Sequence, residues 1–127
     1  MKYEKLTEKI IGCAYGVYNE LGFGFLESVY RNALLIELRE AGLQATAEQE
    51  IKVYFRDHEV GVFSADIVAE GKIILELKSA RQIAKGHEVQ LVNYLVATRS
   101  PVGLLLNFGP DGVDVRRKVP QLPDAEV

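Results

Sequence analysis

The sequence lacks an apolar run of the roughly 18 residues that a membrane-spanning helix needs, and no signal peptide opens it. We therefore expect an intracellular, cytoplasmic protein with no membrane partner. Cysteine is limited to Cys13, which falls within a helical pattern. An intramolecular disulfide is excluded, and the thiol is expected in the core or at its boundary.

The sequence also has fewer positively charged than negatively charged residues. The 15 lysines and arginines are outnumbered by 18 aspartates and glutamates, which gives a net charge of −3. A protein that holds duplex nucleic acid through phosphate contacts alone is usually basic. Any contact with nucleic acid must then be local, assisted by a metal ion or supplied by a partner. Composition alone argues slightly against such a role.

Repeats, low-complexity tracts and domain linkers are missing from the 127 residues. A chain of this length can bury a core of ordinary size, and 48% hydrophobic with 26% charged residues is typical of a globular protein. We predict a single domain over residues 1–127, with a core at about 7–119 and a C-terminal tail at 120–127.

Hydrophobic periodicity predicts two helices, four strands, a third helix and two further strands, in that order. Thr7 is the expected N-cap of the first helix. One face of the second helix is expected to carry Leu26, Tyr30, Ala33, Leu34 and Leu38. The helices are expected at about 7–21, 26–41 and 87–98, and the strands at about 49–55, 60–62, 65–69, 73–78, 104–106 and 113–119. Because a helix joins the strands of Leu75 and Leu104, these strands are predicted to be parallel neighbours in a mixed sheet.

Three charged residues, Asp66, Glu76 and Lys78, interrupt the apolar sequence of a predicted hairpin at 65–78. Because side chains alternate along a strand, Glu76 and Lys78 share one face. Asp66 lies opposite Glu76 on that face only if the strands are joined by an odd-numbered loop at 70–72, which Gly71 permits. We therefore predict this odd loop or a bulge, because a two-residue turn would send Asp66 to the other face.

These three residues suit metal-dependent phosphodiester hydrolysis. Two carboxylates and a backbone carbonyl can hold Mg²⁺, which prefers oxygen ligands and retains several waters. The metal polarises the phosphoryl oxygen and acidifies a bound water, and a lysine one pleat further on can orient that water or neutralise phosphate charge. The alternative is an ordinary hairpin with an Asp–Lys or Glu–Lys ion pair. A competing segment, Glu50-Ile51-Lys52, has no aspartate-bearing strand before it and looks solvated.

Polar residues of the third predicted helix are further site candidates. His87, Gln90, Leu91 and Tyr94 form one stripe, on which the Gln90 amide and the Tyr94 phenol can contact a phosphate or a metal-bound water. The alternative is that Tyr94 belongs to the core and Gln90 satisfies a backbone group. Glu27 opens the second helix, where it either complements the helix dipole or points toward the hairpin.

Together these segments resemble the small GxxExxY-type proteins that are grouped with the PD-(D/E)XK nuclease superfamily. The resemblance covers roughly residues 10–108 and rests, in order, on Gly24-x-x-Glu27-x-x-Tyr30, Asp66, Glu76-Leu77-Lys78 and His87-Glu88-x-Gln90-Leu91-x-Asn93-Tyr94-Leu95. It implies an α/β protein of the restriction-endonuclease-like fold, with a mixed central sheet flanked by helices.

The resemblance also implies a metal site. Asp66, Glu76 and the backbone carbonyl of Leu77 would bind Mg²⁺ or Mn²⁺. Glu27 would complete or support that site, and Lys78 would be the catalytic lysine.

Substrate contacts follow from the same resemblance. Gln90 and Tyr94 match a Gln-x-x-x-Tyr motif that RecB-type exonucleases place beside the active site, and Tyr30 and His87 are further substrate-binding candidates. Two positions depart from the pattern. Ser64 stands where members often have arginine, which is expected to weaken substrate positioning, and Phe23 stands where they often have proline. Neither change touches the metal ligands.

The predicted function is therefore metal-dependent hydrolysis of DNA phosphodiester bonds. The intact Asp66, Glu76 and Lys78 favour an enzyme, because nothing physical would keep three charges on one buried face of a degenerate module. The alternative is a non-catalytic module that binds nucleic acid or protein on the same fold, and the acidic charge and the short chain favour it. A homodimer or a larger complex is a further expectation.

Overall fold

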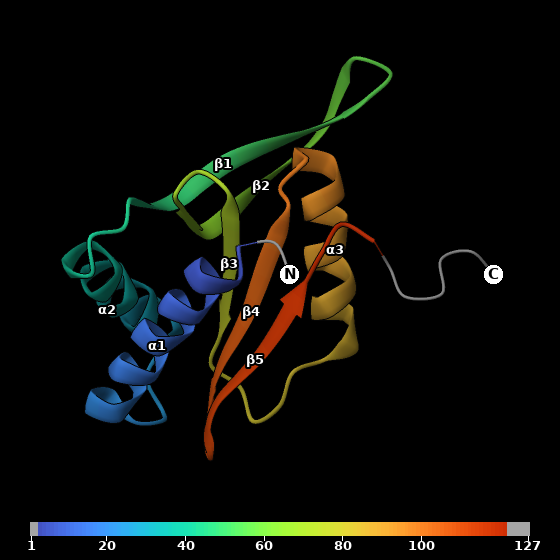
Figure 1. Ribbon diagram of the computed structural model, residues 1–127. Helices are drawn as coiled ribbons and strands as arrows, with labels where there is room; N and C mark the ends of the chain where they lie inside the picture. Colours follow the sequence, from blue (N-terminus) through green and yellow to red (C-terminus); the bar gives the residue numbers. More distant parts are fainter. Residues whose placement is uncertain (1–2, 122–127) are drawn as a thin grey trace.

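The computed structural model describes residues 3–121 and places three helices around a five-stranded sheet (Figure 1). The elements are α1 (Glu4–Leu21), α2 (Glu27–Glu40), β1 (Ala45–Phe55), β2 (His58–Ala69), β3 (Ile73–Lys78), α3 (Lys85–Thr98), β4 (Val102–Gly109) and β5 (Gly112–Lys118). Most of the predicted C-terminal tail, 122–127, lies outside the described residues. None of the described helices is long and apolar enough to cross a membrane.

The strand order is β1-β2-β3-β4-β5, and the sheet is mixed. Only β3 and β4 run parallel, and they are joined through α3, which confirms the predicted crossover. All eight residues of β4 are buried, as expected for a strand covered on both faces. The predicted fold class, a mixed sheet flanked by helices, is confirmed.

Each face of the sheet has its own hydrophobic core. Helices α1 and α2 cover one face, where Ile10 and Leu34 pack with Leu75 and Leu104. Helix α3 covers the other face, where Leu91 and Leu95 pack with Ile74 and Leu105. Cys13 is buried in the first core, with its Sγ 3.9 Å from the carbonyl oxygen of Glu37.

Helix α3 approaches the sheet closely at Gly103 of β4. A Cβ atom at this position would lie 2.9 Å from Cδ1 of Leu91 and 3.1 Å from Cδ2 of Leu95. The missing side chain therefore lets α3 pack directly against the strand, which fixes the depth at which the polar side chains of α3 sit over the sheet.

The predicted element boundaries need three corrections. The strands expected at 60–62 and 65–69 form one continuous strand, β2, because no turn separates them, so three strands rather than four precede α3. Helix α1 begins at Glu4, and Thr7 lies inside it, where its hydroxyl donates to the carbonyl oxygens of Tyr3 and Glu4. Leu26 precedes α2 and its side chain is 76% exposed rather than buried.

The hairpin of β2 and β3 has the predicted odd loop. Ala69 pairs with Ile73, which leaves residues 70–72 as the connection, and both Glu70 and Gly71 have a left-handed backbone with φ of 55° and 64°. The same register carries Asp66 to the position opposite Glu76 on one face of the sheet. This parity is the feature of the fold that assembles the candidate site.

Candidate active site

Asp66 and Glu76 are joined by two crossed hydrogen bonds. The backbone N–H of Asp66 donates to Oε2 of Glu76 at 3.1 Å, and the backbone N–H of Leu77 donates to Oδ2 of Asp66 at 2.7 Å. Each carboxylate thus accepts a backbone donor of the other strand. The two acidic side chains are held side by side. Oδ1 of Asp66 and Oε1 of Glu76 take no part in these two hydrogen bonds.

The backbone ladder is interrupted at Asp66 on both sides. Pairing of β2 with β3 ends at Ile67 and Leu75, one step before Asp66 and Glu76. On the other side, the register would place Glu48 of β1 opposite Asp66, but Glu48 has a φ of 49° and is left out of the ladder. Carboxylates replace the missing ladder bonds, which explains how charged residues are accommodated inside an apolar sheet.

Within the pair, the Glu76 carboxyl is the group that is costly to ionise. Burial is the main cause that raises the pKa of Glu76 from its ordinary 4.5 to about 7. The N–H of Asp66 opposes the shift, while the negative charge of Asp66 raises the pKa further and the positive charge of Lys78 lowers it. A cation between the two carboxylates would relieve this repulsion.

Lys78 lies two residues beyond Glu76 on β3, so both side chains project from the same face. Its charge lowers the pKa of Glu76, which places the ammonium within electrostatic reach of the carboxylate. Within residues 3–121 Lys78 makes no ion pair with either carboxylate. The alternative of a simple hairpin ion pair is therefore not what the structure contains.

Tyr94 of α3 reaches the carboxylate pair from above the sheet. Its ring stacks on Phe63 of β2, with centroids 3.4 Å apart and an interplanar angle of 9°. Burial raises the pKa of the Tyr94 phenol, and the charge of Glu76 raises it further. The stripe residue Tyr94 is thus at the site, packed on one side and electrostatically coupled to Glu76 on the other.

A model of the PD-(D/E)XK nuclease superfamily matches residues 4–119 of the chain. The chain belongs to the PD-(D/E)XK nuclease superfamily. The matched range contains Asp66 and Glu76-Leu77-Lys78, the residues to which the sequence resemblance assigns the site. The mixed sheet with its flanking helices is the restriction-endonuclease-like fold of PD-(D/E)XK proteins.

Among solved structures, the chain is similar to one described as the crystal structure of SSO0001, with a TM-score of 0.54 and 22% sequence identity. The similarity covers 98% of this chain and 63% of the other, so this chain spans less than two thirds of that relative. At this identity the likeness concerns the fold alone. No curated protein matches the sequence.

PD-(D/E)XK nucleases typically use divalent metals, and the donors present here fit such an ion in part. Asp66 and Glu76 offer two adjacent carboxylates that repel one another, and the carbonyl of Leu77 lies between Glu76 and Lys78 in the chain. However, no three acidic, histidine or cysteine side chains within residues 3–121 are grouped closely enough to hold one ion. The ion would therefore depend on two carboxylates, a backbone carbonyl and water.

The prediction that Glu27 completes the metal site is not met in this PD-(D/E)XK structure. Glu27 is exposed in the first turn of α2 and does not join Asp66 and Glu76. The helix start is nevertheless close to the end of β3, because the hydroxyl of Ser79 donates to the carbonyl oxygen of Phe25 at 2.7 Å. Glu27 is thus a neighbour of the site whose side chain faces solvent, where the helix dipole favours a carboxylate.

The prediction that Tyr30 binds substrate is wrong. Its side chain is fully buried, its ring stacks on Phe108 with centroids 4.4 Å apart, and its hydroxyl donates to the carbonyl oxygen of Gly22. Gly22 ends α1 with a φ of 71°. Tyr30 therefore stabilises the turn between α1 and α2 from inside the core and has no surface to offer a substrate.

The other three stripe residues differ in burial. Gln90 is exposed, His87 is half-buried like Tyr94, and Leu91 belongs to the core beneath α3. Within residues 3–121 the buried Nδ1 of His87 has no hydrogen-bond partner. The competing segment is superficial, since Glu50 is exposed and Lys52 pairs with Glu59 at 3.6 Å.

One residue that sequence reasoning missed is Asn107 of β4, which pairs in register with Lys78 and is only 1% exposed. Its Oδ1 accepts the N–H of Ala80 at 3.0 Å and its Nδ2 donates to the carbonyl of Ala80 at 2.9 Å. Asn107 thereby fixes the backbone just after Lys78. The available signal was a polar residue inside the continuous apolar run of β4.

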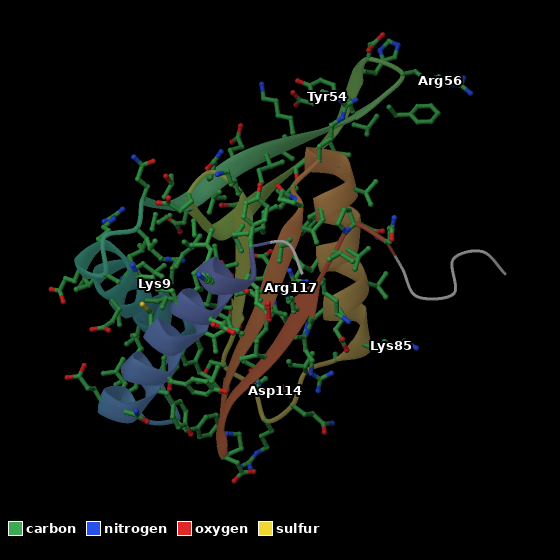
Figure 2. All side chains as sticks on the ribbon, in the orientation of Figure 1. Lys9, Tyr54, Arg56, Lys85, Asp114 and Arg117 are labelled. Atoms are coloured by element: carbon green, nitrogen blue, oxygen red, sulfur yellow. The ribbon has the colours of Figure 1, made fainter. Side chains whose placement is uncertain are left out.

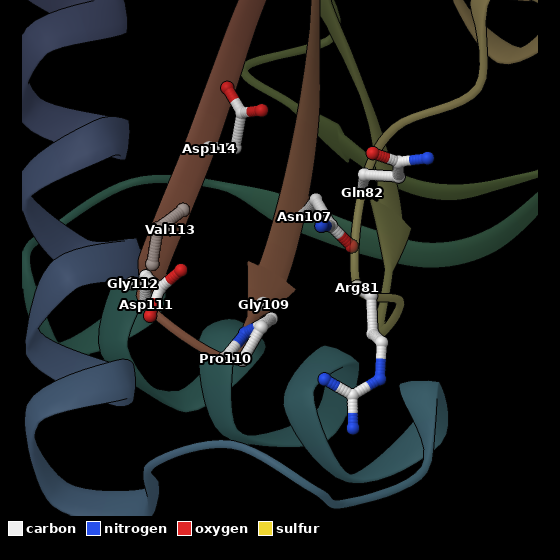
Figure 3. Close-up of a pocket in the computed structure, with 9 residues that line it drawn as sticks. All are labelled: Arg81, Gln82, Asn107, Gly109, Pro110, Asp111, Gly112, Val113 and Asp114. Atoms are coloured by element: carbon white, nitrogen blue, oxygen red, sulfur yellow. The ribbon is translucent and has the colours of Figure 1, made fainter.

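A cavity of about 370 Å³ lies beyond Asn107, between the loop after β3 and the β4–β5 turn (Figure 3). Arg81 and Gln82 line it on one side, and Asp111 and Asp114 on the other. Neither carboxylate of the pair nor Lys78 lines this cavity. We assign the site to the carboxylates by their chemistry, and the cavity is an adjoining hollow next to the segment that follows Lys78.

Proposed function

We propose that the chain is a metal-dependent nuclease of the GxxExxY type that hydrolyses phosphodiester bonds in DNA. The observation that carries the proposal is the crossed hydrogen bonding of Asp66 and Glu76 beside Lys78. The raised pKa of Glu76 supports it, because an arrangement that only stabilised the fold would gain nothing from two adjacent carboxylates. Membership of a nuclease superfamily gives the reaction class.

In this proposal Asp66, Glu76 and the Leu77 carbonyl would hold Mg²⁺ or Mn²⁺, which when bound supplies polarisation of a phosphoryl oxygen and an acidified water. Lys78 projects from the same face. Its ammonium holds the attacking water or a phosphate oxygen by hydrogen bonding and stabilises the negative charge that develops in the transition state. The N–H groups of Asp66 and Leu77 keep both carboxylates in place throughout.

Helix α3 would provide the substrate contacts. The Tyr94 phenol lies near Glu76 and is held by its stacking on Phe63, so it can donate to a phosphate oxygen without reorganisation. Gln90 lies one helical turn earlier on the exposed surface, and His87 a further turn back with its unpartnered Nδ1. These positions trace a path along α3 that suits a nucleic-acid strand.

A non-catalytic module that binds nucleic acid or protein is the second candidate. The net charge of −3 favours its protein-binding form, because an acidic surface weakens binding of nucleic acid. An enzyme that needs a partner subunit for substrate binding would share this charge while retaining the lysine.

The test is cleavage of labelled single-stranded DNA, duplex DNA and RNA in the presence of Mn²⁺, comparing the wild-type protein with Lys78→Ala. A Lys72→Ala variant, purified identically, is the matched control, because Lys72 is an exposed lysine of the β2–β3 loop. We expect cleavage by wild type and Lys72→Ala and none by Lys78→Ala.

The outcomes separate the two candidates. Equal cleavage by all three proteins would indicate a contaminating nuclease and refute the assignment of the site. No cleavage by any of them, with Mn²⁺ still bound by the wild-type protein, would favour the binding module. Cleavage of RNA alone would correct the proposed substrate while preserving the site.

A further inference from the structure

Residues 49–65 form a two-stranded extension of the sheet, here named the β1–β2 arm. Because β2 pairs with β3 only as far as Ile67, the two strands continue beyond the sheet as a ribbon that projects past the end of α3 (Figure 1). Helix α3 covers one face of the arm at its base, where Tyr94 stacks on Phe63. The tip extends from the body and carries Tyr54 and Arg56 (Figure 2).

The exposed face of the arm is unusually apolar. Tyr54, Val60 and Val62 are 59%, 61% and 49% exposed. A two-stranded hairpin is only marginally stable in water, and exposed apolar groups on such a hairpin mark an interaction surface. Both edges of the arm are also unpaired within residues 3–121, since β1 is the edge strand of the sheet.

The outer edge of β1 is regular in one short stretch. The irregular residue Glu48, with φ of 49°, precedes it, and the register shift between Val53 and Tyr54 follows it. Between them, residues 49–53 pair regularly with β2. This stretch is centred on Ile51 and contains no proline. It does contain Lys52, and because an exposed lysine commonly blocks pairing at a sheet edge, a partner strand must place a negative charge opposite it.

The charges around Ile51 are self-complementary. We propose that residues 49–53 pair antiparallel with the same residues of a second copy of this chain, about a two-fold axis at Ile51. Each Glu50 then lies directly opposite Lys52 of the second copy, and the two Ile51 side chains face each other. The sheets of the two copies become one continuous sheet across the dimer. The two-fold axis gives two Glu50–Lys52 pairs, one on each side of Ile51.

A nucleic acid is a poorer occupant of this surface than a second copy. The arm carries three carboxylates, Glu50, Asp57 and Glu59, against two cations, Lys52 and Arg56. Lys52 already pairs with Glu59 at 3.6 Å, and the Arg56 guanidinium lies over the Phe55 ring at 4.8 Å. An excess of negative charge repels phosphates, whereas alternating charges match a copy of the same strand.

The test is sedimentation equilibrium over a concentration series with single and double charge reversals. We expect the wild-type chain to form a dimer, and Glu50→Lys or Lys52→Glu alone to weaken it about tenfold, because each places like charges opposite one another twice. The double variant Glu50→Lys with Lys52→Glu restores opposite-charge pairs across the axis. We expect it to dimerise as the wild type does.

Controls separate this effect from damage to the arm. Glu59→Lys breaks the same intramolecular pair as Lys52→Glu but leaves the proposed interface charges in place, so dimerisation should persist. Circular dichroism and thermal melts check that every variant folds. A wild-type chain that stays monomeric throughout, or a double variant that fails to dimerise although folded, would overturn the proposal. Loss of oligonucleotide binding without any change in mass would instead make the arm a nucleic-acid contact.

Discussion

The side chain of Asn107 holds both backbone polar groups of Ala80, accepting its N–H at 3.0 Å and donating to its carbonyl at 2.9 Å. Because Asn107 lies in register with Lys78 on the neighbouring strand, the clamp fixes the chain directly after the lysine of the candidate site. The carboxylates of Asp66 and Glu76 are held differently, by hydrogen bonds within the β2–β3 hairpin. The proposed binding of metal and the positioning of the lysine therefore depend on separate contacts.

Replacing Asn107 by leucine should separate these two functions. The change removes both bonds to Ala80 and leaves two partly buried backbone groups unpaired, which we expect to lower the free energy of unfolding by about 1–3 kcal/mol. We expect kcat for cleavage to fall while calorimetric Mn²⁺ affinity stays near that of the wild type. Asn93→Leu is the control, because Asn93 is exposed on α3. A parallel loss of metal affinity in Asn107→Leu would contradict a role confined to Lys78.

The raised pKa of Glu76 predicts a pH-dependent stability of the metal-free protein. Because the folded-state pKa of about 7 lies above the ordinary 4.5, the fold favours the protonated carboxyl. This contribution is fully present below pH 4.5 and is lost as pH rises through about 7. The shift corresponds to up to about 3 kcal/mol of unfolding free energy.

Glu76→Gln checks this linkage, since the amide resembles the protonated carboxyl. We expect urea unfolding to show the variant more stable than the wild type at pH 8, with the difference shrinking at pH 5. Glu50→Gln, on the exposed part of β1, should leave the pH dependence unchanged. Identical pH profiles for the wild type and Glu76→Gln would show that burial does not raise this pKa.

Asp66→Asn tests the metal site directly. The amide oxygen can still accept the N–H of Leu77, so the fold should persist, but one anionic ligand is lost. We expect Mn²⁺ to raise the Tm of the wild type and not that of the variant, and the metal-free variant to melt higher because carboxylate repulsion is gone. Unchanged Mn²⁺ affinity, measured by titration calorimetry beside a Glu50→Gln control, would refute the site.

Tyr94 combines a packing role with a proposed substrate contact, and two substitutions distinguish them. Tyr94→Phe keeps the stacking on Phe63 and should leave Tm near that of the wild type, while cleavage falls if the phenol donates to substrate. Tyr94→Ala should lower cleavage and should in addition lower the free energy of unfolding by about 3 kcal/mol, because the stacking on Phe63 is removed. Full cleavage by Tyr94→Phe would restrict the residue to packing.

The arrangement of the hairpin was predictable because it depends on local rules. Side-chain alternation and the parity of the loop at 70–72 determine whether Asp66 meets Glu76, and the structure has that parity. The crossover through α3 follows from an equally general rule for parallel strands. By contrast, the alternation of side chains along β2 does not indicate that backbone pairing is interrupted at Asp66. That interruption depends on the backbone conformation of Glu48 in β1.

Residues that act through long-range contacts were not predictable. Asn107 follows the strand predicted at 104–106, and its polarity alone does not reveal its role, because its partner Ala80 is brought to it only by the β3–β4 pairing. Tyr30 was assigned to the substrate from the family resemblance, whereas the helical periodicity had already placed it on the apolar face of α2, and the structure packs it in the core against Phe108. The exposure of Glu27 likewise depends on how α2 packs and not on its own sequence.

The odd loop at 70–72 also has a consequence for the order of assembly. The carboxylates of Asp66 and Glu76 are brought together when the β2–β3 hairpin closes its three-residue loop. The hydrogen bonds of Asn107 to Ala80 can form only after α3 has folded and β4 has paired with β3. Short closures cost less entropy and form faster than long ones. With the proposed metal ligands, a nascent chain should therefore be able to bind a divalent ion before Lys78 is in position and before cleavage is possible.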